Sequence, residues 1–221
     1  MLLALAAGAA GCTGDAAEPK ASAADRLTAA ATTIGDAPAM EIDLRTKALP
    51  SGQSGLLSAE GVGDHSPAFR GKVEVSAGGA SLGAEVVAVD GKVWAKTGFA
   101  PGFGIIDPAS LQAPDPAVLV GTGPTDGLPG LLTRTQDLKT GDKSRDGDEV
   151  LTDLTGSIPG ADVAALLPSA DASSAFDVTY RLTDDDELHD ATITGPFYGD
   201  EDVTYTLEIT PMNEAVTITA P

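Results

Sequence analysis

Cys12 is the residue whose type and position most clearly indicate chemistry. It is the only cysteine of the 221-residue chain, and it follows an apolar segment, residues 2–11, that ends in small residues. A thiol at that place is typical of a bacterial lipoprotein signal peptide, which is cleaved before the cysteine so that the thiol carries acyl chains. We therefore predict a signal peptide over residues 1–11 and an acylated Cys12.

The segment departs from the usual lipoprotein motif in two ways. Ala9 stands where such motifs usually carry leucine, and neither Lys nor Arg precedes the apolar segment. We expect that the second departure reflects a start codon assigned too far downstream. The alternative interpretation is an isolated buried cysteine near the N-terminus, which would need no disulfide partner.

The remaining reactive side chains do not form a pattern typical of a metal site or an enzyme. His65 and His189 are the only histidines and lie far apart in the sequence, whereas zinc needs three or four N or S ligands. The acidic residues 184–187 lack the spaced ligands and glycine of a calcium loop, so a solvated hairpin tip is expected. Ser110, Ser157 and Ser173 lie near turns, but none of the three stands in a G-x-S-x-G motif. The sequence thus predicts no enzyme, no cofactor and no metal.

The charge of the chain excludes nucleic acid as a partner. The net charge is −20, and from residue 146 onward seventeen acidic residues face a single base, Arg181. Such a surface repels phosphate backbones and anionic lipid head groups, so membrane attachment must come from acyl chains on Cys12. Aromatic residues make up only 4% of the chain, which disfavours the stacking platforms of carbohydrate and single-strand binders.

The sequence after Cys12 begins with a spacer and a helix. Residues 12–24 comprise the lipidated cysteine and a small, polar, flexible spacer, and residues 25–221 are predicted as one domain. Asp25 is predicted to cap a short helix that ends at Gly35. Its apolar residues at helical spacing are Leu27, Ala30, Ala31 and Ile34.

Apolar and polar residues then alternate with a period of two, which predicts an antiparallel sheet with one apolar and one wet face. Asp90-Gly91 predicts a two-residue hairpin turn. Trp94, just after it, belongs either to the core or to the rim of a cavity. The predicted strands cover residues 39–45, 69–75, 82–89, 92–96, 149–156, 175–182, 187–194, 203–210 and 215–219.

Residues 97–135 differ, because proline and glycine interrupt them every few residues. They are nevertheless rich in Ile, Leu, Val and Phe, so they must pack on another part of the protein. Short helices are predicted at 116–120 and 128–134, and a further one at 158–167, which Pro168 ends. No domain boundary is evident, so we expect one sheet with the helices gathered on one side.

These elements and their order resemble an actinobacterial lipoprotein family known from mycobacterial LprG, LppX, LprA and LprF. The resemblance rests on Cys12, the helix AADRLTAAATT, the hairpin VVAVDGKVWAK, the stretch IIDPASL…DPAVLV…DGLPGLLT and the closing ITPMNEAVTITAP. It implies an α+β fold, a strongly curved antiparallel half-barrel with short helices on its concave side enclosing an apolar cavity. It also implies that the cavity carries multi-acylated envelope lipids or lipoglycans.

The strand pattern alone describes an ordinary filled core equally well. With the resemblance, we expect a carrier on the outer face of the cytoplasmic membrane, with acylated lipids and an envelope lipid exporter as candidate partners. The alternative is an envelope scaffold lipoprotein with a filled core. The candidate cavity-lining residues come from inward strand positions and from the helix predicted at 128–134, which would cover them. They are Ile42, Leu44, Val73, Val75, Leu131, Leu132, Phe176, Val178, Tyr205 and Leu207.

Overall fold

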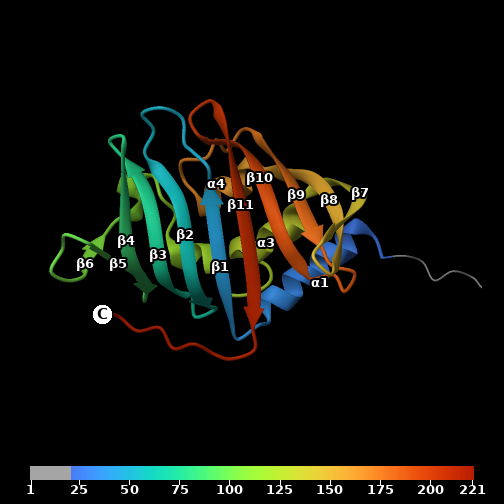
Figure 1. The fold of residues 1–221 in the computed structure, drawn as a ribbon, viewed down its shortest axis with the longest axis horizontal. Coiled ribbons are helices and arrows are strands. Elements are labelled where there is room, and N and C mark those ends of the chain that lie inside the picture. Colours follow the sequence, from blue (N-terminus) through green and yellow to red (C-terminus); the bar gives the residue numbers. More distant parts are fainter. Residues whose placement is uncertain (1–20) are drawn as a thin grey trace, which may run out of the picture.

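The computed structural model describes residues 21–221, which fold around one antiparallel sheet of eleven strands (Figure 1). Cys12, the predicted signal peptide and most of the predicted spacer lie outside the described residues. The strand order is β6-β5-β4-β3-β2-β1-β11-β10-β9-β8-β7, so β6 and β7 form the two edges and the sheet stays open. The strands are β1 (Ala39–Thr46), β2 (Gly55–Asp64), β3 (Ala68–Ala77), β4 (Ala80–Val89), β5 (Lys92–Thr97), β6 (Gly104–Ile106), β7 (Gln136–Asp146), β8 (Glu149–Pro159), β9 (Ala175–Leu182), β10 (Leu188–Tyr198) and β11 (Glu201–Met212).

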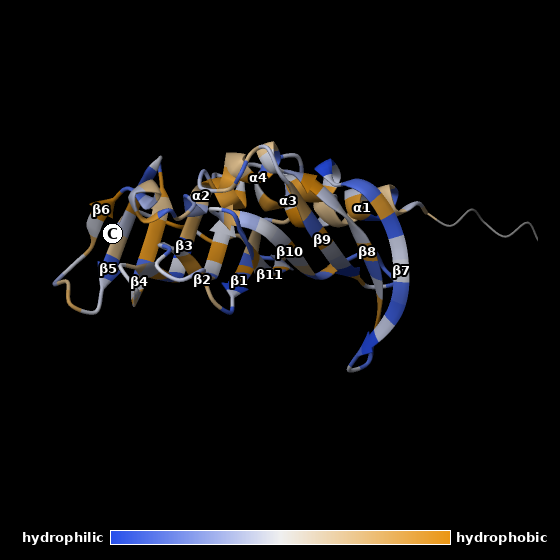
Figure 2. Ribbon diagram, turned by 90° about the horizontal axis from the view of Figure 1, so that it is seen from above, coloured by the Kyte–Doolittle hydropathy of each residue, from blue (hydrophilic) through white to orange (hydrophobic). Residues whose placement is uncertain are grey.

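Short helices cover one face of this curved sheet (Figure 2). They are α1 (Ala23–Gly35), the 3-10 helix η1 (Pro108–Leu111), α2 (Pro116–Val120), α3 (Gly127–Arg134) and α4 (Gly160–Leu166). The predicted α+β half-barrel with helices on its concave side is therefore confirmed. None of the described helices has the length and apolar character needed to cross a membrane.

Helix α1 begins one turn earlier than predicted. Ser22, not Asp25, is the N-cap: its Oγ accepts a hydrogen bond from the Asp25 backbone N–H at 3.2 Å. The Asp25 carboxylate in turn accepts from the Ser22 backbone N–H at 3.2 Å, which completes a capping box. Ser and Asp are both favourable N-cap residues, so the sequence alone did not show at which of the two the helix begins. The predicted apolar stripe is buried as expected.

The structure contains three strands that were not predicted and lacks one strand that was. β2, β6 and β7 were not predicted, because β2 is interrupted by glycine, β6 has three residues, and β7 is polar and exposed throughout except at half-buried Leu138. The predicted strand at 215–219 is wrong, since those residues form no ladder. They instead place Ile218 against Ala68 and Val87 on the outer face of the sheet. The alternation there reflects packing of an extended segment rather than strand pairing.

The turn between β4 and β5 forms as predicted. Asp90 and Gly91 both have positive φ, 53° and 66°, which is the geometry of the tight turns that match strand twist. Val86 to Val89 thereby pair in register with Ala95 to Lys92. The hairpin sets which side chains of β4 and β5 face the concave side.

Candidate functional site

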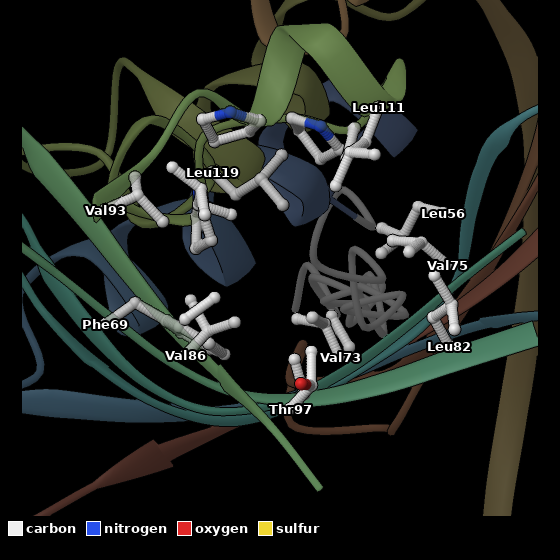
Figure 3. Close-up of a pocket in the computed structure, with 18 of the residues that line it drawn as sticks. Leu56, Phe69, Val73, Val75, Leu82, Val86, Val93, Thr97, Leu111 and Leu119 are labelled. Atoms are coloured by element: carbon white, nitrogen blue, oxygen red, sulfur yellow. The ribbon is translucent and has the colours of Figure 1, made fainter. Parts of the chain in front are cut away.

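An apolar cavity of about 140 Å³ lies between the concave face of β1–β6 and the segment that contains η1 and α2 (Figure 3). Every side chain that lines it is apolar except Thr97. In Figure 3, Leu111 and Leu119 lie on the helical side, whereas Val73 and Thr97 lie on the sheet side. The lining residues are Ile42, Leu56, Ala59, Phe69, Val73, Val75, Leu82, Ala84, Val86, Val93, Ala95, Thr97, Ile106, Pro108, Leu111, Ala113, Pro114, Pro116 and Leu119.

Small residues aligned across four strands form the floor of the cavity. Ala59, Val73, Ala84 and Thr97 are consecutive register partners from β2 to β5. Side chains of directly opposite residues lie on the same face of a sheet, so these four make one band. Because the band contains no large side chain, it leaves space above the sheet that a row of leucines would fill.

The neighbouring row of the floor contains two glycines. Gly61 and Gly71 are register partners, and the ring of Phe69 lies over both. A Cβ placed on Gly61 or Gly71 would come within 2.7 Å or 2.6 Å of the Phe69 Cζ atom. The glycines thus let the Phe69 ring lie close to the backbone at the cavity wall rather than across the cavity.

The roof of the cavity, residues 107–120, is built from two similar Asp-Pro turns. Asp107 and Asp115 each accept a hydrogen bond from the backbone N–H two residues on, at 3.1 Å and 2.9 Å. In each turn the proline follows at the first helical position, where its missing N–H has no cost. The result is two short helical turns instead of one long helix, with Leu111 and Leu119 directed at the cavity.

A second apolar cavity, of about 50 Å³, adjoins the first below α3 and α4. The two cavities share three lining residues, Leu56, Pro114 and Leu119, which therefore form the partition between them. The other residues of the second cavity are Leu44, Leu128, Leu131, Val163, Leu166, Leu167, Ile193, Phe197, Tyr198, Tyr205 and Leu207.

Two buried tyrosines fix the backbone of the partition. The Tyr198 hydroxyl accepts a hydrogen bond from the Leu56 N–H at 3.1 Å, and the Tyr205 hydroxyl donates to the Leu56 carbonyl. The two hydroxyl oxygens are 3.0 Å apart. The register of β2 and β3 shifts between Leu56 and Ser58, which interrupts the regular pairing of the two strands. The two tyrosine hydroxyls therefore provide the hydrogen bonds of the Leu56 N–H and carbonyl at this point. Burial raises the pKa of both phenols, so both stay protonated donors.

The structure divides the predicted lining residues into three groups. Ile42, Val73 and Val75 line the main cavity. Those at the second cavity are Leu44, Leu131, Tyr205 and Leu207. The third group, Leu132, Phe176 and Val178, is buried in the core and belongs to the lining of neither cavity.

Aromatic packing explains the position of Phe176 in the third group. The ring centroids of Phe176 and Phe197 are 4.8 Å apart, and those of Phe197 and Tyr205 are 4.9 Å apart, both edge to face. These rings fill the concave side of β9–β11. The strand period predicted correctly that Phe176 and Tyr205 point inward, but not that rings and helices fill that half of the sheet.

Sequence reasoning missed Leu56, the β4–β5 floor and the roof. The signal for the roof was present, because residues 97–135 are apolar although proline and glycine interrupt them. Trp94 lies on the outer face and lines neither cavity, since its neighbours Val93 and Ala95 face the main cavity. It is half-buried, so neither earlier interpretation of this residue applies.

The fold and the site together define an open antiparallel half-barrel with an apolar cavity under short, interrupted helices. The family model for the LppX_LprAFG lipoproteins matches residues 22–218. The chain therefore belongs to the LppX_LprAFG lipoprotein family.

Solved structures show the same fold. The crystal structure of LprF from Mycobacterium bovis, 14% identical, matches with a TM-score of 0.70 over 90% of this chain and 96% of that chain. The crystal structure of the lipoprotein LppX from Mycobacterium tuberculosis, 19% identical, matches with a TM-score of 0.59 over 89% of this chain and 97% of that chain. A search of curated protein sequences finds no match.

Proposed function

We propose that this protein is a lipid-anchored carrier on the outer face of the cytoplasmic membrane, which binds acylated envelope lipids and transfers or presents them. The observation that supports this most directly is the main cavity, whose lining offers an acyl chain almost only apolar contacts. Burial of each CH₂ group contributes about 0.8 kcal/mol, so a chain can leave a bilayer for such a cavity at little net cost. Signal peptide 1–11, acylated Cys12 and spacer 12–24 are part of this proposal.

The size of the cavity limits the cargo it holds without rearrangement. An engineered apolar cavity of about 150 Å³ stays dry and binds benzene. The main cavity, at about 140 Å³, is therefore large enough for a segment of one acyl chain. A multi-acylated cargo needs the two cavities to join, which requires displacement of Leu56, Pro114 and Leu119 at the partition. Two of these residues belong to the roof, whose helix α2 has only five residues.

A scaffold lipoprotein with a filled core is the second candidate. The aromatic packing of Phe176, Phe197 and Tyr205 in the C-terminal half of the sheet favours it, because that half retains only the 50 Å³ cavity. In that case the protein would act through protein contacts, with an envelope exporter as the candidate partner. The main cavity is the feature that a scaffold does not require.

Val73→Trp separates the two functions. Val73 is half-buried in the middle of the cavity floor, so the indole should occupy the cavity, block uptake of a pyrene-labelled fatty acid from vesicles, and leave the thermal midpoint nearly unchanged. The matched control is Val62→Trp, since Val62 lies on the same sheet, pairs with Arg70 and points to the outer face. Undiminished uptake by Val73→Trp, or an unfolded variant as overpacking of a filled core would produce, contradicts the carrier proposal.

A further inference from the structure

The hairpin of β5 and β6, residues 92–106, carries the two most exposed large apolar side chains among the described residues. Phe99 in its loop is 97% exposed, and Ile105 on β6 is 67% exposed. Figure 2 shows apolar colour on β6 and its loop at one end of the molecule, away from α1. Exposed Phe and Ile side chains on the same hairpin do not contribute to the core, and apolar residues gathered at one exposed site indicate a binding surface.

Aromatic residues concentrate in this hairpin although they are scarce elsewhere. Of five phenylalanines, three tyrosines and a single tryptophan in the chain, Trp94, Phe99 and Phe103 lie here. Trp94 and Ile105 are register partners, so they lie side by side on the outer face of the sheet. An exposed Phe in the loop and a Trp on the adjoining strand are residues that the interface of a bilayer favours.

The charge of the hairpin also differs from that of the rest of the protein. Residues 91–106 contain Lys92 and Lys96 and no acidic residue, in a chain with net charge −20. The Lys96 ammonium lies 5.9 Å from the centroid of the Phe103 ring, next to the apolar loop. Glu85, the register partner of Lys96, lies with Glu60 and Glu74 in the same surface groove as Lys96, and Asp90 and Asp107 bound the stretch. The hairpin itself thus carries only positive charge, which complements an anionic lipid surface that the C-terminal half repels.

We propose that the β5–β6 hairpin docks on the surface of an anionic bilayer, with Phe99 and Ile105 in the interfacial layer and Lys92 and Lys96 near the head groups. This contact is separate from the anchor at Cys12 and does not depend on what the cavity holds. The hairpin also forms one wall of the main cavity, through Thr97 and Ile106. Docking would therefore bring that wall to the membrane from which an acyl chain leaves.

Vesicle binding tests the proposal. The chain from residue 12 onward with Cys12→Ala retains every described element and removes both acylation and the predicted signal peptide. We expect it to sediment with phosphatidylglycerol vesicles and to bind phosphatidylcholine vesicles more weakly. It should dissociate from the anionic vesicles at high salt, which screens the positive charges of the lysines. Trp94 is the single tryptophan, so its emission should shift to the blue on binding.

Variants locate the contact. Phe99→Asp with Ile105→Asp should weaken binding to anionic vesicles by about tenfold or more, because two apolar side chains are lost from the interface. The control is Val118→Asp, since Val118 on α2 is also an exposed apolar residue, at 44%. Equal binding by the hairpin variant, or no binding of the parent chain, overturns the proposal. A dimer in sedimentation equilibrium that the hairpin variant abolishes, without vesicle binding, would overturn it in favour of self-association.

Discussion

At the scale of single residues, the hydroxyl groups of the three buried tyrosines are hydrogen-bonded within the protein, and Thr97 is the one polar side chain that lines the main cavity. Tyr198 and Tyr205 bond the backbone of Leu56, and the Tyr180 hydroxyl bonds Thr135 Oγ1 at 2.7 Å. The lining therefore offers a lipid almost no hydrogen-bond partner. In the proposed carrier, the polar head group of the cargo must stay outside the cavity, at its mouth, while the acyl chain enters.

The three buried tyrosines predict an alkaline loss of stability. Burial raises the pKa of Tyr180, Tyr198 and Tyr205 in the folded protein, whereas tyrosine side chains in the unfolded chain ionise near pH 10. Above that pH the unfolded state binds fewer protons than the native state, so the free energy of unfolding falls as pH rises. Each tyrosine contributes up to about 1.4 kcal/mol per pH unit. Stability is unaffected by these groups below the unfolded pKa.

Urea unfolding at a series of alkaline pH values measures this slope. We expect Tyr180→Phe to flatten the slope, since the variant has one fewer buried phenol while Lys titration is unchanged. Identical slopes for the variant and the parent chain would show that the Tyr180 hydroxyl ionises freely in the native state.

At the scale of elements, the side chains of Ser22 and Asp25 stabilise the first turn of α1, although the sequence predicted Asp25 as the N-cap. Because Ser22 caps the helix and Asp25 closes the box, Ser22→Ala should lower the free energy of unfolding by about 1 kcal/mol. Thr28→Ala, on an exposed position of the same helix, should have little effect or stabilise slightly. Chemical denaturation measures both, and a neutral Ser22→Ala would contradict the assignment of the cap.

The two edges of the sheet are protected in different ways. β6 has only three residues, and β7 alternates acidic and basic side chains that are exposed nearly throughout, including Lys139, Lys143 and Asp146. Short or charged edge strands disfavour pairing with another chain. The sheet can therefore stay open without offering another chain a long apolar edge strand for pairing.

Elements with an apolar face were predictable from the sequence, and elements without one were not. β9 and β11 alternate strictly, and α2 follows an Asp-Pro start, so all three were predicted within a few residues. β7 buries nothing fully and so carries no periodic signal. The position of the cavity was not predictable, because the strand period gives the inward face but not which part of that face helices and rings fill.

At the scale of the whole molecule, the two halves of the sheet have different roles. β2–β5 have a floor of small residues and, with β1 and β6, line the main cavity, whereas β8–β11 pack against helices and aromatic rings. The main cavity therefore lies under a roof of short turns, beside a half of the sheet that helices and rings fill.

Native mass spectrometry of the Cys12→Ala protein, purified without detergent from an actinobacterial host, tests the proposed carrier function. The substitution removes acylation, so any added mass must come from bound cargo. We expect an added mass that extracts into organic solvent as an acylated lipid. A bare protein mass, with no uptake from lipid vesicles offered afterwards, would contradict the carrier function and leave the scaffold.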